Sequence, residues 1–271
     1  MEPTEFLPDL PRVCAVSYLN TVPLVWGLLH HPPLQNIFDL DFAVPSECAD
    51  QLASGQADIG ILPVIEMARQ RLDFFRGSGI ASFGPVRSIL LISKVPFAEI
   101  RTLATDSGSR TSVMLARVIL AEKFGATPSL ISLAPNLTAM LGMADAALLI
   151  GDAALHVDPA ALPFQTLDLG QEWTALTGLP MVFAVWAGRR GSLRQEYGDA
   201  LLASCRFGIS RRDEIVRQEA PRRALGESLV REYLTRHIVF ELGDREYAGL
   251  DLFLQRAATF DPAVVPGGVC V

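Results

Sequence analysis

The chain lacks the long apolar runs that would place it in a membrane. Its richest apolar stretches, residues 146–150 and 181–187, have only the length of a strand. The first ten residues hold three acidic side chains and lack the basic start and apolar core of a secretory signal. The four cysteines are scattered without a CxxC spacing, which is typical of reduced thiols. We therefore expect a cytoplasmic protein that does not bind membranes.

Positive charge is also scarce. Lys and Arg number 23 against 30 Asp and Glu, so the net charge is −7. No basic stripe lies among aromatic residues, and nucleic acid is not an expected partner. The most Arg-rich region, residues 211–236, also holds five acidic side chains and is expected to form a solvated, salt-bridged helical face. An anionic ligand would therefore need local help from backbone dipoles and single arginines.

The common cofactor and nucleophile motifs are missing. None of the four histidines has a metal-ligand spacing, and GxSxG, GxGxxG and GxxxxGK[ST] do not occur. A Ser-His-Asp triad formed by distant residues stays open. We expect no metal and no cofactor, so any chemistry would depend on polar positioning and electrostatics.

The chain does contain a regular alternation of strand and helix patterns. Half of its residues are hydrophobic and its mean hydropathy is +0.30, which predicts a well-packed globule. Strand patterns alternate with helical patterns over residues 13–16, 21–29, 38–44, 45–53, 57–62 and 63–71. Short links between such elements are typical of an α/β protein with a mostly parallel sheet.

The middle of the chain is interpreted as an insertion. Apolar strands are expected at residues 87–93 and 182–187, close to two crossings between lobes. Residues 94–187 would form one lobe, inserted between residues 1–93 and 188–271, which would form the other lobe with a helical tail. Two crossings make a hinge, and ligands of open α/β sheets lie beyond the carboxyl ends of the strands. We expect a ligand cleft between the lobes.

Polar side chains follow the first expected strand, in Ser17, Tyr18 and Asn20. An Asn amide can donate and accept hydrogen bonds, which suits a bound hydroxyl or carboxylate. Asn20 could equally cap the helix that follows. Local chemistry leaves both roles open.

A Gly-Pro turn precedes Arg87 and Ser88. The two residues are expected to enter a strand on opposite faces, so that one of them faces the cleft. A strand serine is also often a purely structural hydroxyl, and that alternative stays open for Ser88.

Residues 107–112 join an expected strand end to a helix start and are rich in small hydroxyl side chains. A helix N-terminus offers free N–H groups and the positive end of a dipole, so carboxylates and phosphates bind there. Ser109, Arg110, Thr111 and Ser112 are therefore candidate substrate-binding residues, the alternative being an ordinary helix cap. Ser46, the expected N-cap of an earlier helix, joins the same candidates.

Gly151 and Asp152 follow a buried apolar strand. Asp152 could accept a ligand hydrogen bond or act as a base, or it could cap the next helix. Both readings stay open.

Six segments occur together in a familiar order. They are S-Y-L-N-T-V-P-L (17–24), A-D-I-G-I-L-P (57–63), G-P-V-R-S (84–88), S-R-T-S (109–112), A-A-L-L-I-G-D (146–152), and D-L-G-Q-E-W with T-G-L-P-M-V-F-A-V-W-A (168–187). Over about residues 12–190 the chain resembles the menaquinone-biosynthesis family of enzymes. The resemblance implies a two-lobed, type 2 periplasmic-binding-protein-like α/β fold, each lobe a mostly parallel sheet flanked by helices.

One branch of that family dehydrates chorismate to 3-[(1-carboxyvinyl)oxy]benzoate on the futalosine route, as a hydro-lyase without a cofactor. The sister branch, 1,4-dihydroxy-6-naphthoate synthase, typically has a His-Glu pair where this chain has Gly151 and Asp152. The resemblance therefore favours the dehydratase branch. It implies Asn20 and Ser88 as catalytic residues. The base is left open between Asp152 and the substrate's own enolpyruvyl carboxylate. Gly151 and Arg87 are expected to contact the substrate.

Two binding proteins share the expected fold. A solute-binding protein would hold a small anion without turnover and would normally carry a signal peptide or a lipid-attachment Cys. A transcription-factor effector domain would need a helix-turn-helix module, which the sequence does not indicate. The expected partner is a small molecule, and the oligomeric state is not indicated.

Overall fold

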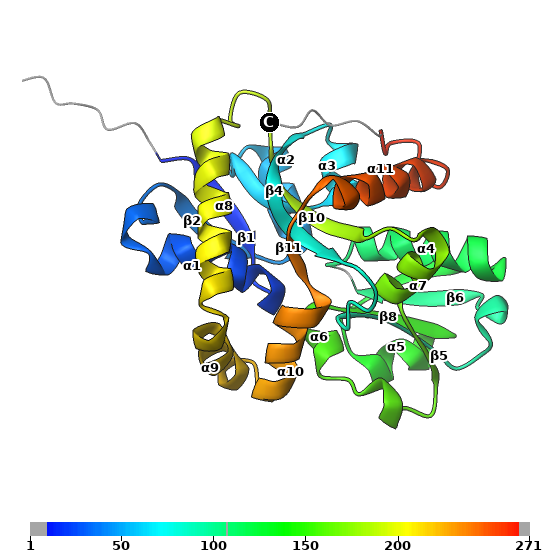
Figure 1. The fold of residues 1–271 in the computed structure, drawn as a ribbon. Helices are drawn as coiled ribbons and strands as arrows, with labels where there is room; N and C mark the ends of the chain where they lie inside the picture. The colour runs from blue at the N-terminus through cyan, green and yellow to red at the C-terminus, as the bar shows by residue number, and fades with distance from the viewer. Residues whose placement is uncertain (1–9, 107, 266–271) are drawn as a thin grey trace, which may run out of the picture.

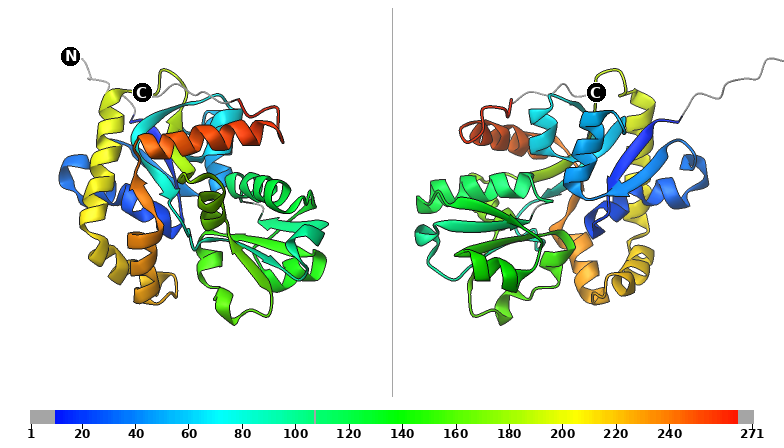
Figure 2. Two further views of the ribbon diagram at one scale, coloured as in Figure 1. Left: turned by 45° about the vertical axis from the view of Figure 1, so that its right-hand side comes forward. Right: turned by 180° about the vertical axis from the view of Figure 1, so that it is seen from behind.

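The computed structural model describes residues 10–106 and 108–265, which form two lobes (Figure 1). Residues 1–9, Ser107 of the expected anion-binding segment, and Cys270 lie outside the described residues. Each lobe contains one sheet with helices packed around it, as the two further views in Figure 2 show. The expected two-lobed α/β fold is confirmed.

The first lobe contains a six-stranded sheet. In spatial order its strands are β11 (Val239–Glu241), β4 (Asp73–Ser82), β10 (Met181–Gly188), β3 (Ile59–Pro63), β1 (Arg12–Val16) and β2 (Asp39–Ala43). Its helices are α1 (Val22–His30), α2 (Pro45–Ser54), α3 (Val64–Arg69), α8 (Gln195–Ser210), α9 (Arg212–Arg222), α10 (Glu227–Glu232) and α11 (Asp244–Ala258). Short η1 (Leu19–Thr21), η2 (Pro32–Leu34) and η5 (Tyr233–His237) complete it.

The second lobe contains a five-stranded sheet. In spatial order its strands are β7 (Ser129–Leu133), β6 (Thr102–Asp106), β8 (Ala146–Ile150), β5 (Ile89–Ser93) and β9 (Gln165–Asp168). Its helices are α4 (Thr111–Phe124), α5 (Leu137–Met143), α6 (Gly151–Leu155) and α7 (Leu169–Thr177), with short η3 (Phe97–Glu99) and η4 (Pro159–Ala161).

The two sheets are mixed, and the expectation of mostly parallel sheets is wrong in this detail. β1 pairs in parallel with β2 and β3, but β10 runs antiparallel to β3 and β4. Likewise β6 is parallel to β7 and β8, but β5 is antiparallel to β8 and β9. These antiparallel pairs arise where the chain passes from one lobe to the other. β5 and β10 follow such a passage and begin at the cleft, whereas β1, β3, β6 and β8 end at the cleft.

The crossings differ in place from the expected boundaries at residues 94 and 187. β5 (Ile89–Ser93) belongs to the second lobe and β10 (Met181–Gly188) to the first. The chain therefore crosses between Ser82 and Ile89, and again between Thr177 and Met181. Both strands are buried along their whole length, so their apolar pattern does not distinguish one sheet from the other.

The core explains why β8 reads as an unbroken apolar run. Leu148 packs in the large cluster that joins the two lobes, and its neighbour Leu149 packs in a smaller cluster on the opposite face of the same sheet. Both faces of this sheet are covered, and central strands of such sheets are apolar throughout.

Glycines end two of the helices. Gly55 and Gly125 end α2 and α4 in the left-handed conformation, with φ of 76° and 68°. The prediction for Ser46 is wrong, because Val44 is the N-cap of α2 and Pro45 occupies the first turn. The fixed φ of proline suits that position, and it starts the helix before Ser46.

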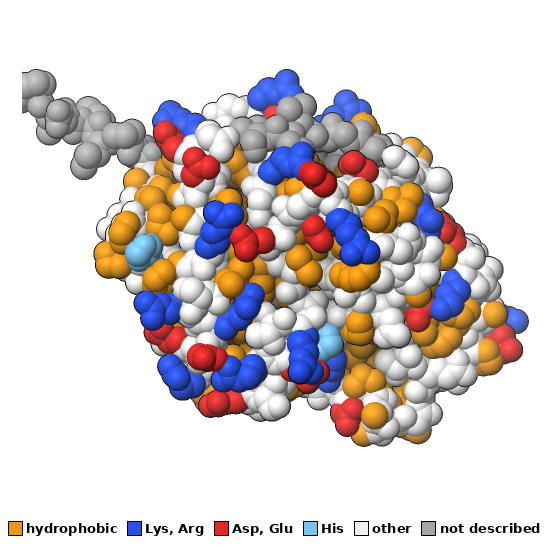
Figure 3. Space-filling model, viewed as in Figure 1, with side chains coloured by type: hydrophobic (Ala, Val, Ile, Leu, Met, Phe, Trp, Pro, Cys, Tyr) orange, Lys and Arg blue, Asp and Glu red, His pale blue; other side chains and the backbone are white. Residues whose placement is uncertain are grey.

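The Arg-rich tail is salt-bridged, as predicted. Arg222 and Arg223 pair with Glu219, and Arg231 pairs with Asp213. Figure 3 shows Lys and Arg interspersed with Asp and Glu over this face of the molecule. No helix in the described part of the chain is long and apolar enough to cross a membrane.

Candidate functional site

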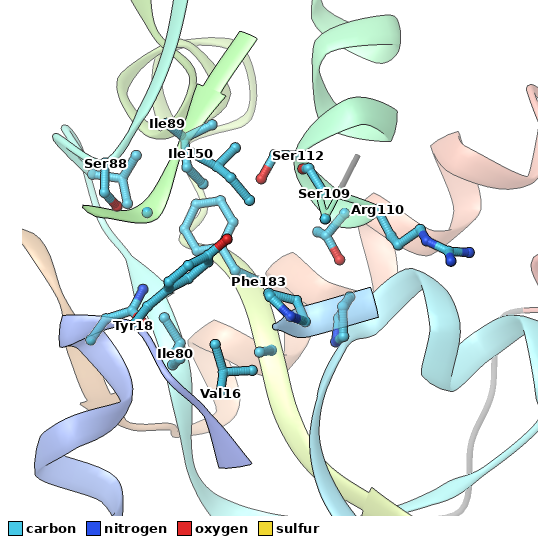
Figure 4. A pocket seen from close by; sticks show the side chains of 18 of the residues that line it. Val16, Tyr18, Ile80, Ser88, Ile89, Ser109, Arg110, Ser112, Ile150 and Phe183 are labelled. Atoms are coloured by element: carbon cyan, nitrogen blue, oxygen red, sulfur yellow. The ribbon is translucent and has the colours of Figure 1, made fainter. Parts of the chain in front are cut away.

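A pocket lies between the lobes, with about 570 Å³ of empty space that includes its opening to solvent. Val16, Ile61 and Ile80 line it from the first lobe, and Ile89 and Ile150 from the second. Polar residues stand at its ends (Figure 4). The pocket therefore has apolar walls between polar ends.

Asn20 and Ser88 both line this pocket. Asn20 lies in η1, directly after β1, and it does not cap α1, whose N-cap is Thr21. The Oδ1 atom of Asn20 is buried and finds no hydrogen-bond partner among the described residues. Buried polar atoms are nearly always paired, so an unpaired one at a pocket points to a ligand.

Ser88 is only 1% exposed and lies in the turn before β5. Its Oγ accepts a hydrogen bond of 2.8 Å from the hydroxyl of Tyr233, a residue of the C-terminal tail. Sequence reasoning missed Tyr233, because nothing local to residue 233 marks it as close to residue 88.

The turn that carries Ser88 is fixed by the D-L-G-Q-E-W segment. The carboxylate of Asp168 accepts from the backbone N–H groups of Val86 and Arg87, at 2.9 and 2.6 Å. It also caps α7 by accepting from Gly170 and Gln171. A Cβ at Gly170 would lie 2.9 Å from the carbonyl oxygen of Gly84, so only glycine allows this approach. Two of the family-like segments thus form one support for Ser88.

Arg87 does not line the pocket. It adopts a left-handed φ of 65°, so residues 87 and 88 do not continue β5 on alternate faces as expected. Its guanidinium donates to the carbonyl oxygens of Ala154 and Val157 in the second lobe. Burial lowers the pKa of Arg87. The side chain is committed to these carbonyls rather than to the pocket.

The start of α4 forms the opposite polar end. Ser109, Arg110, Thr111 and Ser112 all line the pocket, and no side chain caps the helix. Ser109 is 7% exposed, and its Oγ has no partner among the described residues. Free N–H groups of a helix of this length, together with an unpaired hydroxyl, form a site for an anion.

Arg110 is partly neutralised. Its guanidinium lies 3.4 Å from Glu66 and 3.9 Å from Asp50. Thr111 Oγ1 accepts from the backbone N–H of Ile65 at 3.5 Å, which ties the helix start to α3. Within this end of the pocket, backbone N–H groups and serine hydroxyls are the donors left free.

Tyr18 occupies the middle of the pocket, as Figure 4 shows. Burial, and then the charges of Asp106 and Asp152, raise the pKa of its phenol. Gly151 lines the pocket beneath the ring with a φ of 56°, and a Cβ there would lie 2.8 Å from the ring carbons. Tyr18 appeared in the sequence only as part of a polar segment, and this contact across the lobes was not predicted.

Asp152 does not line the pocket, and it does not cap α6. One carboxylate oxygen accepts from the backbone N–H of Leu19 at 3.0 Å, and the other pairs with Arg223. Both partners belong to the first lobe, whereas Asp152 belongs to the second. Asp152 therefore ties the lobes together.

Ser46 and Asp106 lie outside the set of residues that line the pocket. Ser46 lies in the first turn of α2 and does not line the pocket, although its neighbour Pro45 does. Asp106, which the sequence did not single out, is buried at the end of β6 and accepts from the N–H of Gly108 at 2.9 Å. Burial raises the pKa of its carboxyl. Among the described residues, no group of three or more His, Cys, Asp or Glu could hold a metal ion.

Comparison with known proteins identifies relatives in sequence and in fold. A curated chorismate dehydratase of Thermus thermophilus is 29% identical over 267 residues, covering 92% of this chain and 94% of the relative. The crystal structure of protein AF1704 from Archaeoglobus fulgidus superposes with a TM-score of 0.73 at 16% identity, covering 92% of this chain and 97% of that one.

The periplasmic aliphatic sulphonate binding protein SsuA from Escherichia coli has the same fold. Its TM-score is 0.64 at 16% identity, covering 97% of this chain and 90% of that one. The expected periplasmic-binding-protein-like fold is thus confirmed. A family model described as menaquinone biosynthesis matches residues 11–259, and the chain belongs to this family.

Proposed function

We propose that this chain dehydrates chorismate to 3-[(1-carboxyvinyl)oxy]benzoate, as a carbon–oxygen lyase of menaquinone biosynthesis. The observation that carries the proposal is the pocket itself: unpaired Asn20 Oδ1 and the Ser88 hydroxyl at one end, and free donors of α4 at the other. The similarity to a chorismate dehydratase over nearly the whole chain supports the same substrate.

The start of α4 would hold a carboxylate of the substrate. Ser109 and Ser112 offer hydroxyls beside the free N–H groups of this helix. The apolar walls at Ile80, Ile89 and Ile150 would contact the faces of the ring. Such a site orients the substrate and leaves its C4 hydroxyl at the other end of the pocket.

Asn20 and Ser88 would bind the leaving C4 hydroxyl. Hydrogen bonds aimed at a group on which charge develops lower the barrier most in a pocket shielded from water. In the reaction the C3–H bond and the C4–O bond break. The electron pair of the C3–H bond becomes the C3=C4 π bond that completes the aromatic ring, and the pair of the C4–O bond leaves with the hydroxide. The proton and the hydroxide together make water, so atoms and charge balance without an oxidant or a reductant.

The base is assigned to the substrate. None of the described residues that line the pocket carries a carboxylate or an imidazole, and Asp152 is bonded through both oxygens elsewhere. The enolpyruvyl carboxylate of chorismate stands next to C3, so it would take the C3 proton. Asp152 is proposed to hold the lobes together instead.

Gly151 supports the dehydratase against the sister synthase. A side chain at position 151 would meet the ring of Tyr18, so a histidine does not fit there while Tyr18 stays in place. The combination of Tyr18 and Gly151 therefore favours a pocket shaped for a compact ring.

The direct test mixes the purified protein with chorismate and follows ultraviolet absorbance and product mass. Loss of one water, with the enolpyruvyl group retained on an aromatic ring, is the expected result. Tight binding of intact chorismate would instead indicate a solute-binding protein. Without binding, the cyclic futalosine-derived intermediate would be tried next, and its cleavage would assign the chain to the sister branch.

A further inference from the structure

Tyr233 touches the site from outside the pocket. It begins the π-helical turn η5 in the C-terminal tail, is 1% exposed and does not line the pocket. Its hydroxyl nevertheless donates to Ser88 Oγ at 2.8 Å. π-helical turns are rare and occur frequently at functional sites.

This hydrogen bond, the Tyr233–Ser88 bridge, fixes the polarity of Ser88. Ser88 Oγ accepts from Tyr233, so the serine hydrogen is left for the pocket. Ser88 is thereby held as a donor, which suits the oxygen of a bound alcohol.

The turn η5 holds the Ser88 segment at a second point. Nδ1 of His237 donates to the carbonyl oxygen of Pro85 at 2.9 Å. The tail therefore contacts residues 85 and 88 of the same crossing segment. Together with Asp168 on the other side, it leaves the Ser88 hydroxyl little freedom to turn away.

We propose that Tyr233 is a positioning residue that presents the Ser88 hydroxyl as a donor to a substrate hydroxyl. The proposal rests on the proposed function, in which that hydroxyl is the C4–OH of chorismate. It extends the functional machinery into the C-terminal tail, which lies beyond the family-like segments of the sequence.

The kinetic test uses Tyr233→Phe, which keeps the ring and removes the hydroxyl. We expect kcat to fall at least about tenfold, about 1.4 kcal/mol, with KM changed much less. In a Ser88→Ala background the same change should cost less than about twofold, because the partner is already gone. Equal losses in both backgrounds, or a wild-type kcat, would overturn the proposal. Tyr247→Phe is the matched control, since it removes a buried hydroxyl that accepts from Gly77 outside the pocket.

A second measurement needs neither turnover nor the Phe variant. The bridging hydroxyl proton of Tyr233 should give a slowly exchanging proton resonance in the wild-type protein, and Ser88→Ala should shift or abolish it. An unchanged resonance in Ser88→Ala, or no protected hydroxyl proton, would contradict the bridge. If wild type fails to convert chorismate, the proposed function fails while this spectrum still decides the bridge. If wild type converts chorismate and the spectrum shows no bridge, only the role of Tyr233 fails.

Discussion

At the scale of single residues, the two hydroxyl-binding side chains are expected to act at the reaction step. Ser88→Ala should lower kcat by about a hundredfold, the order found for one removed donor at a developing charge. Asn20→Ala should also lower kcat, because the side chain that faces the substrate is removed. Steady-state rates with chorismate measure this. Ser93→Ala is the matched control, because it is a buried serine whose hydroxyl bonds to Val95, away from the pocket. Wild-type kcat in both test variants would remove them from the mechanism.

Gly151 is expected to tolerate no side chain. In Gly151→Ala the new methyl meets Tyr18 at 2.8 Å and the residue keeps a left-handed φ, so both affinity for chorismate and thermal stability should fall. Gly142→Ala is the control: it lies in α5 with nothing within 4 Å of the new methyl, and it should stabilise slightly. Equal behaviour of the two variants in calorimetry and binding would contradict the packing of Tyr18 on Gly151.

Asp106 should make stability depend on pH in a defined direction. Its folded pKa is raised by burial, so the native state binds the proton more tightly than the unfolded state does. The resulting loss of stability sets in as pH rises from the ordinary carboxyl pKa through the raised one. Asp106→Asn, which keeps an acceptor for Gly108, should therefore melt at a higher temperature than wild type at pH 7. The two should converge at a pH below the ordinary carboxyl pKa, and convergence at neutral pH instead would refute the assignment.

The sequence pointed to some of the site residues, misplaced one and missed another. Asn20 and Ser88 stood out through their family-like segments, and the structure places both at one pocket. The position of Arg87 was wrong because a left-handed φ breaks the strand alternation, and β propensity does not reveal a single such residue. Tyr233 is 145 residues from its partner Ser88, so no local pattern connects them.

At the scale of elements, Asp168 is expected to support both the fold and the position of Ser88. Asp168→Ala removes the acceptor of four backbone N–H groups and should lower the free energy of unfolding by about 2 kcal/mol or more. It should also lower kcat, because the turn before β5 loses its anchor. Asn136→Ala, which removes only the N-cap of α5, is the control and should leave kcat unchanged. Denaturant unfolding and turnover together check this, and a loss of stability without a loss of kcat would separate the anchor from the site.

Helix ends depend on the local sequence more than strand partners do. Glycine just past α2 and α4 follows from the left-handed cap, which is a local requirement. The direction and sheet of β5 and β10 depend on the path between lobes, which is a property of the whole chain. The sequence of an apolar strand that is buried on both faces indicates neither its direction nor the sheet to which it belongs.

At the scale of the whole molecule, Asp152 connects the lobes rather than serving as a base. In Asp152→Asn the ion pair with Arg223 is lost, whereas an acceptor for Leu19 remains. We expect KM for chorismate to rise, because closure around the ligand is weakened. The value of kcat should fall by less than about tenfold, or 1.4 kcal/mol. A loss of several orders of magnitude in kcat with unchanged KM would restore Asp152 as the base.

The most direct test of the site compares wild type with Asn20→Ala/Ser88→Ala, both shown to be folded, on chorismate alone. We expect wild type to release one water per chorismate and to leave the enolpyruvyl group on an aromatic ring. The double variant should still bind chorismate at the start of α4 and form almost no product. Full turnover by the double variant, or binding without turnover by wild type, would contradict the assignment of this pocket as a dehydratase site.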